Sequence, residues 1–101
     1  MKIKVQSEKI IEILKKLEGI QIVLEGPDDA KEAIDLILIK TGMSARDHYA
    51  KLKDIKVTSF QKYETSAVDY KMIFLLEFIF EDDVSSKAKV AMIKEFQGLF
   101  Q

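Results

Sequence analysis

Residues 67–80, AVDYKMIFLLEFIF, constrain the fold of this chain more than any other stretch. Apolar or aromatic side chains recur here at every second position, which is the period of a β-strand whose alternate side chains point to one face. These residues are Val68, Tyr70, Met72, Phe74, Leu76, Phe78 and Phe80, of which we expect Phe74 and Leu76 to lie in the core. A strand of this length would span roughly 46 Å, whereas strands usually have about five or six residues. We therefore expect it to bend at a β-bulge or to extend beyond its own sheet.

Composition indicates one globular domain over residues 1–101, because 48% of the residues are hydrophobic and 33% are charged. Lys and Arg number 16 against 17 Asp and Glu. This balance argues against nucleic acid or a membrane as the partner. The absence of cysteine excludes disulfides and thiolate chemistry. The first residues, MKIKVQSEK, lack the apolar core of a signal peptide, so we expect a cytoplasmic protein, and the composition points to a thermophilic source.

The first half of the chain predicts alternating strands and helices. Residues 2–5 form a short strand, and residues 8–18 form a helix with Ser7 as its N-cap and Gly19 at its end. Residues 20–25, IQIVLE, are predicted to be a second strand, parallel to the first in a βαβ unit. A helix then begins at Pro27 and ends at Thr41, and a short helix follows over residues 45–53.

The second half predicts a hairpin and a final helix. Residues 55–64 pair with residues 67–80 in a register that sets Ile55 beside Leu76, Val57 beside Phe74 and Lys62 beside Asp69. Ser85 or Ser86 caps the last helix, residues 87–100. The predicted fold class is α+β: a two-layer, four-stranded mixed sheet in the order β-α-β-α-α-β-β-α. Its helices lie mainly on one face, and the plan is loosely ferredoxin-like.

The second face of the hairpin carries an apolar patch that soluble monomers seldom expose. Because the third strand pairs with only about ten residues of the fourth, residues 77–80 should overhang it. Both features predict a homodimer, unless a helix crosses this face. The expected interface residues are Phe60, Ile73, Leu75, Phe78 and Ile79.

Two alternatives use other residues. A small basic–aromatic surface of Lys56, Phe60, Lys62 and Lys71 would suit nucleic acid, with Tyr63 and Tyr70 on the covered face beside Met72. A ligand or substrate site shared across a dimer would use Arg46, His48 and Tyr49.

Catalysis is not predicted, because adjacent helix residues give His48 no positioned partner. The acidic turn of Glu81, Asp82 and Asp83 lacks the ligand spacing of a calcium loop. We therefore expect no catalytic residue, no metal and no cofactor. The leading hypothesis is a non-catalytic protein-interaction module, self-associating through the hairpin over residues 55–80, the C-terminal helix, or both, with a further protein partner as an option.

Overall fold

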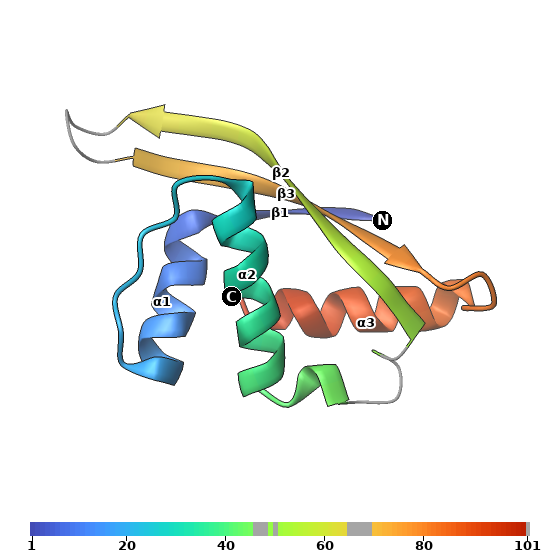
Figure 1. The fold of residues 1–101 in the computed structure, drawn as a ribbon. Helices are drawn as coiled ribbons and strands as arrows, with labels where there is room; N and C mark the ends of the chain where they lie inside the picture. The colour runs from blue at the N-terminus through green and yellow to red at the C-terminus, as the bar shows by residue number, and fades with distance from the viewer. Residues whose placement is uncertain (46–48, 50, 65–69, 101) are drawn as a thin grey trace.

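The structure, a computed structural model, describes residues 1–45, 49, 51–64 and 70–100. Three strands form one antiparallel sheet in the order β1-β3-β2, and the three α-helices all lie on one side of it (Figure 1). The elements are β1 (Lys2–Gln6), α1 (Ser7–Glu18), α2 (Pro27–Lys40), the 3-10 helix η1 (Met43–Ala45), β2 (Leu52–Glu64), β3 (Tyr70–Phe80) and α3 (Ser86–Gly98). The fold is therefore α+β, with one layer of helices and one of strands.

The predicted four-stranded mixed sheet is wrong, because residues 20–25 are not a strand. Helices α1 and α2 both run away from the sheet, so the chain must return along the length of α1 before α2 begins (Figure 1). The twelve residues of α1 rise about 18 Å. Six extended residues span about 20 Å and so cover this distance. The segment is extended because it is a return connection between two helices that run the same way.

The sequence predicted Ser7 as the N-cap of α1, but its side chain does not cap this helix. Gln6 is the N-cap residue, and the Ser7 hydroxyl instead accepts a hydrogen bond of 3.0 Å from the backbone N–H of Met72 in β3. Both groups are buried, so the bond fixes the start of α1 against the sheet. It also satisfies a backbone donor of β3 that would otherwise be buried without a partner.

The other predicted helix ends are largely confirmed. Gly19 ends α1 in the left-handed conformation, with φ of 69°, and Pro27 is the first residue of α2. The Ser85 hydroxyl accepts the N–H of Ala88 and caps α3. The predicted helix over residues 45–53 is not present as such, because β2 already begins at Leu52; residues 46–48 and 50 lie outside the described part.

Two β-bulges set the register of the hairpin. Ile55 pairs with Phe78 and Val57 with Leu76, two residues further along β3 than predicted. The register then shifts at Phe60, an extra residue between Ser59 and Gln61. Because β2 has 13 residues and pairs with β3 as far as Phe80, the predicted overhang does not exist. Both extra residues lie in β2, so the bulge expected within residues 67–80 is not found in the paired residues of β3.

The core lies between the sheet and the helices. Phe74 and Leu76 are fully buried, which confirms their predicted place in the core. The rings of Phe78 and Phe96 meet edge to face at 5.1 Å between their centroids, and they join the end of β3 to α3. Ile10 and Leu14 of α1 and Ile34 and Ile37 of α2 complete the layer.

Candidate binding face of the sheet

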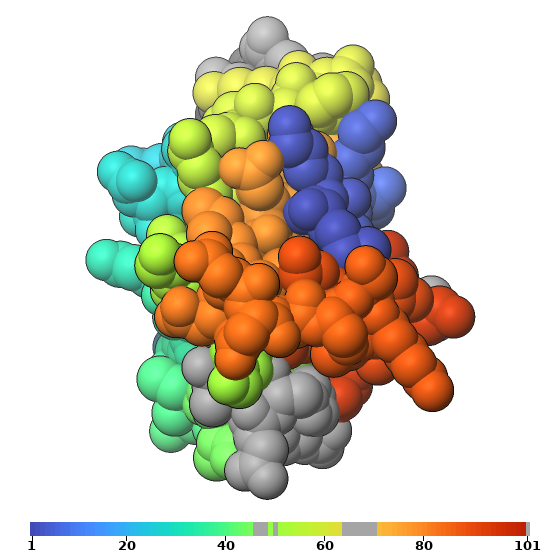
Figure 2. Space-filling view, turned by 90° about the vertical axis from the view of Figure 1, so that its right-hand side faces the viewer, coloured from blue at the N-terminus to red at the C-terminus, as the bar shows by residue number. Residues whose placement is uncertain are grey.

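One face of the sheet is turned away from all three helices, and its side chains define what we call the open face (Figure 1). On β1, Ile3 and Val5 pack into or against the core, so Lys2, Lys4 and Gln6 point outward. On β3, the same alternation turns Ile73, Leu75, Glu77 and Ile79 away from the core. In Figure 2 the residues of β1 lie at the surface, between β2 above and α3 below.

The bulge at Phe60 decides which side chains of β2 reach the open face. Before the bulge, Lys56 pairs with Glu77 and Thr58 with Leu75. After it, Gln61 pairs with Ile73 and Tyr63 with Lys71. Directly opposite residues share a face of the sheet. The extra residue therefore moves Tyr63 to the open face, whereas regular alternation had predicted the covered face.

Lys4 and Phe60 contact each other across the open face. The Lys4 ammonium lies 4.0 Å from the centroid of the Phe60 ring, which is a cation–π contact. The ring is nevertheless 49% exposed, and Tyr63 further along β2 is 44% exposed. Two aromatic side chains are thus accessible on the open face.

A shallow hollow of about 130 Å³ lies at the centre of the open face, lined by Lys2, Lys56, Thr58, Leu75 and Glu77. Glu77 pairs with Lys2 on one side and Lys56 on the other, and its carboxylate is 3.6 Å from the Lys2 ammonium. One carboxylate thus faces two lysines. The lysine stems also cover part of the apolar floor, which agrees with the partial burial of Leu75.

Charge is distributed unevenly over the molecule. Between Glu77 and the Tyr63–Lys71 pair, the open face carries four lysines, Lys2, Lys4, Lys56 and Lys71. They face the carboxylate of Glu77 and that of Glu8 in α1, which lies 3.4 Å from the Lys71 ammonium. The whole chain has a formal net charge of −1, so the rest of it carries an excess of acids. One sheet face is therefore basic in a chain that is nearly neutral, which composition alone does not reveal.

The end of the sheet near Ile79 is acidic. Glu81, Asp82 and Asp83 follow β3 directly, and Asp54 is the pairing partner of Ile79. Asp54 is 3.2 Å from Lys31 of α2, and Asp83 is 3.3 Å from Lys51. The basic part of the open face is thus the part between Glu77 and the Tyr63–Lys71 pair.

The structure places the residues predicted for an interface on two different faces of the sheet. Phe60, Ile73, Leu75 and Ile79 belong to the open face, where Ile79 is 36% exposed and Ile73 and Leu75 are partly buried. Phe78 is 3% exposed and lies in the core. Its side chain is therefore on the helix side of the sheet.

Three of the four residues predicted for nucleic acid lie on one face. Lys56, Phe60 and Lys71 share the open face, whereas Lys62 pairs with Met72 and points to the other side. The expected neighbour of Lys62, Asp69, lies outside the described residues. Sequence reasoning missed Lys2, Lys4 and Tyr63, because only the strand order β1-β3-β2 and the bulge bring them to this face.

Of the residues predicted for a ligand site, Arg46 and His48 lie outside the described part of the chain. Tyr49 is buried and lines a cavity of about 210 Å³ between α2 and β2, together with Lys31, Asp35 and Asp54. Burial lowers the pKa of Lys31, but the hydrogen bonds and charges of Asp35 and Asp54 outweigh it, so the pKa is raised overall. Lys31 is thus engaged with two carboxylates, which link α2 to β2.

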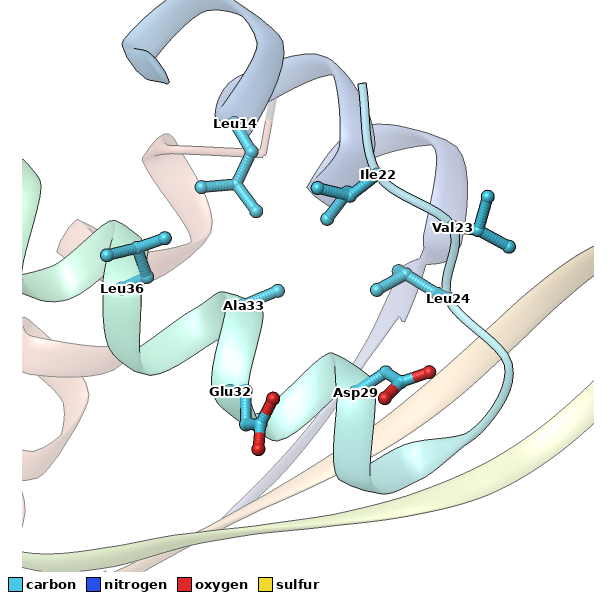
Figure 3. A pocket seen from close by; sticks show the side chains of 8 residues that line it. All are labelled: Leu14, Ile22, Val23, Leu24, Asp29, Glu32, Ala33 and Leu36. Atoms are coloured by element: carbon cyan, nitrogen blue, oxygen red, sulfur yellow. The ribbon is translucent and has the colours of Figure 1, made fainter. Parts of the chain in front are cut away.

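A second cavity, of about 220 Å³, lies where residues 22–24 cross the groove between α1 and α2 (Figure 3). Leu14, Ile22, Leu24, Ala33 and Leu36 provide its apolar lining. Asp29 borders it, and its carboxylate accepts the backbone N–H of Glu25 at 2.9 Å. That carboxylate therefore serves the turn before α2, and the cavity has the character of incomplete packing under a connection.

Searches of protein-family models, curated proteins and solved structures find no match to this chain. Within the described residues, no helix has the length and apolar character needed to cross a membrane. The same residues hold no group of three or more His, Asp or Glu side chains placed to bind a metal ion.

Proposed function

We propose that this chain is a non-catalytic binding module that docks an anionic partner on the open face of its sheet. The observation that carries the proposal is the concentration of Lys2, Lys4, Lys56 and Lys71 on the one sheet face that no helix covers. A sheet needs only one covered face to form a core, so the residues on its other face are free to serve recognition. The expected cytoplasmic location belongs to this proposal.

Retention on immobilised heparin, a polyanion without bases, tests this function. Lys4→Glu and Lys56→Glu reverse charges on the open face, and Lys16→Glu makes the same change at an exposed position of α1. We expect both open-face variants to elute at lower salt than the wild type, because local positive potential attracts a polyanion even when the net charge is negative. Lys16→Glu should shift elution less. Equal shifts in all three variants would contradict the proposal.

Self-association through the same face is the second candidate function, and the apolar row of Ile73, Leu75 and Ile79 on β3 favours it. The overhang that first motivated it is gone, and a twofold contact would bring the lysines of two copies together. Sedimentation over a wide concentration range tests it. A dimer that Leu75→Lys dissociates would support self-association, and a monomer at every concentration would contradict it.

A further inference from the structure

We propose that the anionic partner of the open face is single-stranded nucleic acid, with bases stacked on Phe60 and Tyr63 and phosphates on the surrounding lysines. This inference rests on the proposed function, because it names the partner of the same surface. Such a partner needs accessible aromatic rings for its bases, cations beside these rings for its phosphates, and a surface long enough for several nucleotides.

Phe60 and Tyr63 are the aromatic side chains placed on the open face within the described residues, and both expose close to half of their surface. Neither ring is needed to fill the core, which lies on the other side of the sheet. Every base has a flat π-face that can stack on such a ring, whatever its sequence. Exposed aromatics on an antiparallel sheet are one way in which proteins hold unpaired bases.

The contact between Lys4 and Phe60 fits this use. An ammonium 4.0 Å from the ring centroid occupies the position above the ring that a base would take. Lys4 has a long, flexible side chain, so the ammonium can leave the ring for a phosphate when a base stacks there. The exchange keeps the cation close to negative charge and gives the ring a larger flat partner.

The cations extend along the strand direction beside the rings. Lys2 and Lys56 flank Glu77, Lys4 lies over Phe60, and Lys71 is opposite Tyr63. The Lys71 ammonium is 3.4 Å from the carboxylate of Glu8 in α1, an exposed ion pair that a phosphate would replace. From Glu77 to Lys71 the path covers seven residues of β3, and the six rises between them span about 20 Å. The acidic residues beyond Ile79 would repel phosphates, so they limit the path at that end. The surface is therefore suited to a short segment of single strand.

The same features discriminate against other partners. Bases in a duplex are stacked on one another, so a duplex would use the lysines and leave Phe60 and Tyr63 without a role. A second copy of the chain would present its lysine-rich face to an identical lysine-rich face, which is unfavourable. Single-stranded nucleic acid matches both the charge and the rings.

Fluorescence anisotropy with labelled 12-nucleotide dT and U oligomers, and with a 12-base-pair duplex, tests the inference. We expect both single strands to bind more tightly than the duplex. With four phosphate contacts, log K should fall with log salt at a slope of about −3, and Lys56→Ala should reduce that slope by about 0.7. Phe60→Ala and Tyr63→Ala should each weaken binding by about tenfold without changing the slope. Lys16→Ala and Val23→Ala, at exposed positions away from this face, are the matched controls.

The outcomes separate the inference from the function on which it rests. Binding that depends on the open-face lysines but not on Phe60 or Tyr63, or that favours the duplex, overturns the single-strand inference and leaves a polyanion-binding surface. Binding that changes equally in the lysine variants and in Lys16→Ala overturns both. A dimer that Leu75→Lys dissociates, with no oligonucleotide binding at low salt, assigns the face to a second copy and overturns the inference.

Discussion

The ammonium of Lys4 in β1 lies 4.0 Å from the centroid of the Phe60 ring in β2, although β3 separates the two strands in the sheet. The contact spans the open face above Leu75, which pairs with Lys4 on one side and Thr58 on the other. Phe60 follows Lys56 and Thr58 on this face, and its ring and the Lys4 side chain are long enough to meet across β3. The contact joins the two edge strands without any contribution from the core.

This exposed contact should contribute little to stability. An exposed cation–π pair is worth about 0.5–1 kcal/mol, and the Phe60 ring remains half exposed. We therefore expect Phe60→Ala and Lys4→Ala to lower the free energy of unfolding by at most about 1 kcal/mol in urea titrations. Such a result would show that binding measurements on these variants report on the surface. A loss above about 3 kcal/mol would mean that Phe60 is part of the core.

Phe74 provides the opposite case on the same sheet. Its side chain is fully buried between the sheet and the helices, so Phe74→Ala should cost about 3–5 kcal/mol, through lost burial and the cavity left behind. Thermal and urea unfolding measure this cost, with Phe60→Ala as the matched control because it removes the same ring at an exposed position. Equal costs for the two variants would contradict the assignment of the two faces.

Ser7 tests how the helix layer is attached to the sheet. Ser7→Ala removes the hydroxyl that accepts the N–H of Met72 and leaves that buried donor without its partner. The expected cost is about 1–3 kcal/mol, measured by urea unfolding. Ser59→Ala removes an exposed hydroxyl from the same sheet and should cost far less. If the two variants lose the same stability, the bond to Met72 is not important for the fold.

The ion pairs of Lys31 should make the free energy of unfolding depend on pH in the alkaline range. Its folded-state pKa is raised above 10.5, so its stabilising contribution is fully present below the pKa of the unfolded chain and is lost as pH rises through the folded-state value. Lys31→Met should cost about 0.5–1 kcal/mol near pH 8, because the lysine is partly exposed. The difference from the wild type should shrink above about pH 10.5. Urea titrations of both proteins at several pH values measure this difference in unfolding free energy. A difference that grows as pH rises would contradict the stabilising role of the charged Lys31.

The sequence predicted α1, α2 and α3 well because their apolar stripes and end signals are local. Gly19, Pro27 and Ser85 each act within one helical turn, so no tertiary information is needed to place them. Phe74 and Leu76 were found by the same reasoning, since alternation in a long strand reports which face is buried.

Strand pairing could not be predicted from these local patterns. Residues 20–25 alternate because an extended segment lies on α1 and α2, with Leu24 buried and Val23 78% exposed. A period of two thus reports extended backbone with one covered side, and it does not report a partner strand. The hairpin register was wrong by three residues near the loop, where Lys62 pairs with Met72 and not with Asp69, and the bulge at Phe60 reduces this offset to two. Nothing local in the sequence marks where the pairing ends or that Phe60 is the extra residue.

That extra residue also hid part of the candidate site. Regular alternation placed Tyr63 on the covered face and Lys62 on the open one, and the bulge reverses both assignments. Lys2 and Lys4 joined the site only through the pairing of β1 with β3, which are more than sixty residues apart in the chain. Local periodicity carries no information about such a pairing.

Titration of the isotope-labelled protein with a dT oligomer, followed by NMR of the backbone amides, tests the central claim most directly. The claim predicts chemical-shift changes concentrated at Lys2, Lys4, Lys56, Phe60, Tyr63 and Leu75, and small changes on the outer surfaces of α1 and α2. It also predicts that Phe60→Ala diminishes them while Val23→Ala does not. Changes centred on the cavity between α1 and α2, or no changes at low salt and high oligomer concentration, would contradict the assignment of the open face as the binding surface.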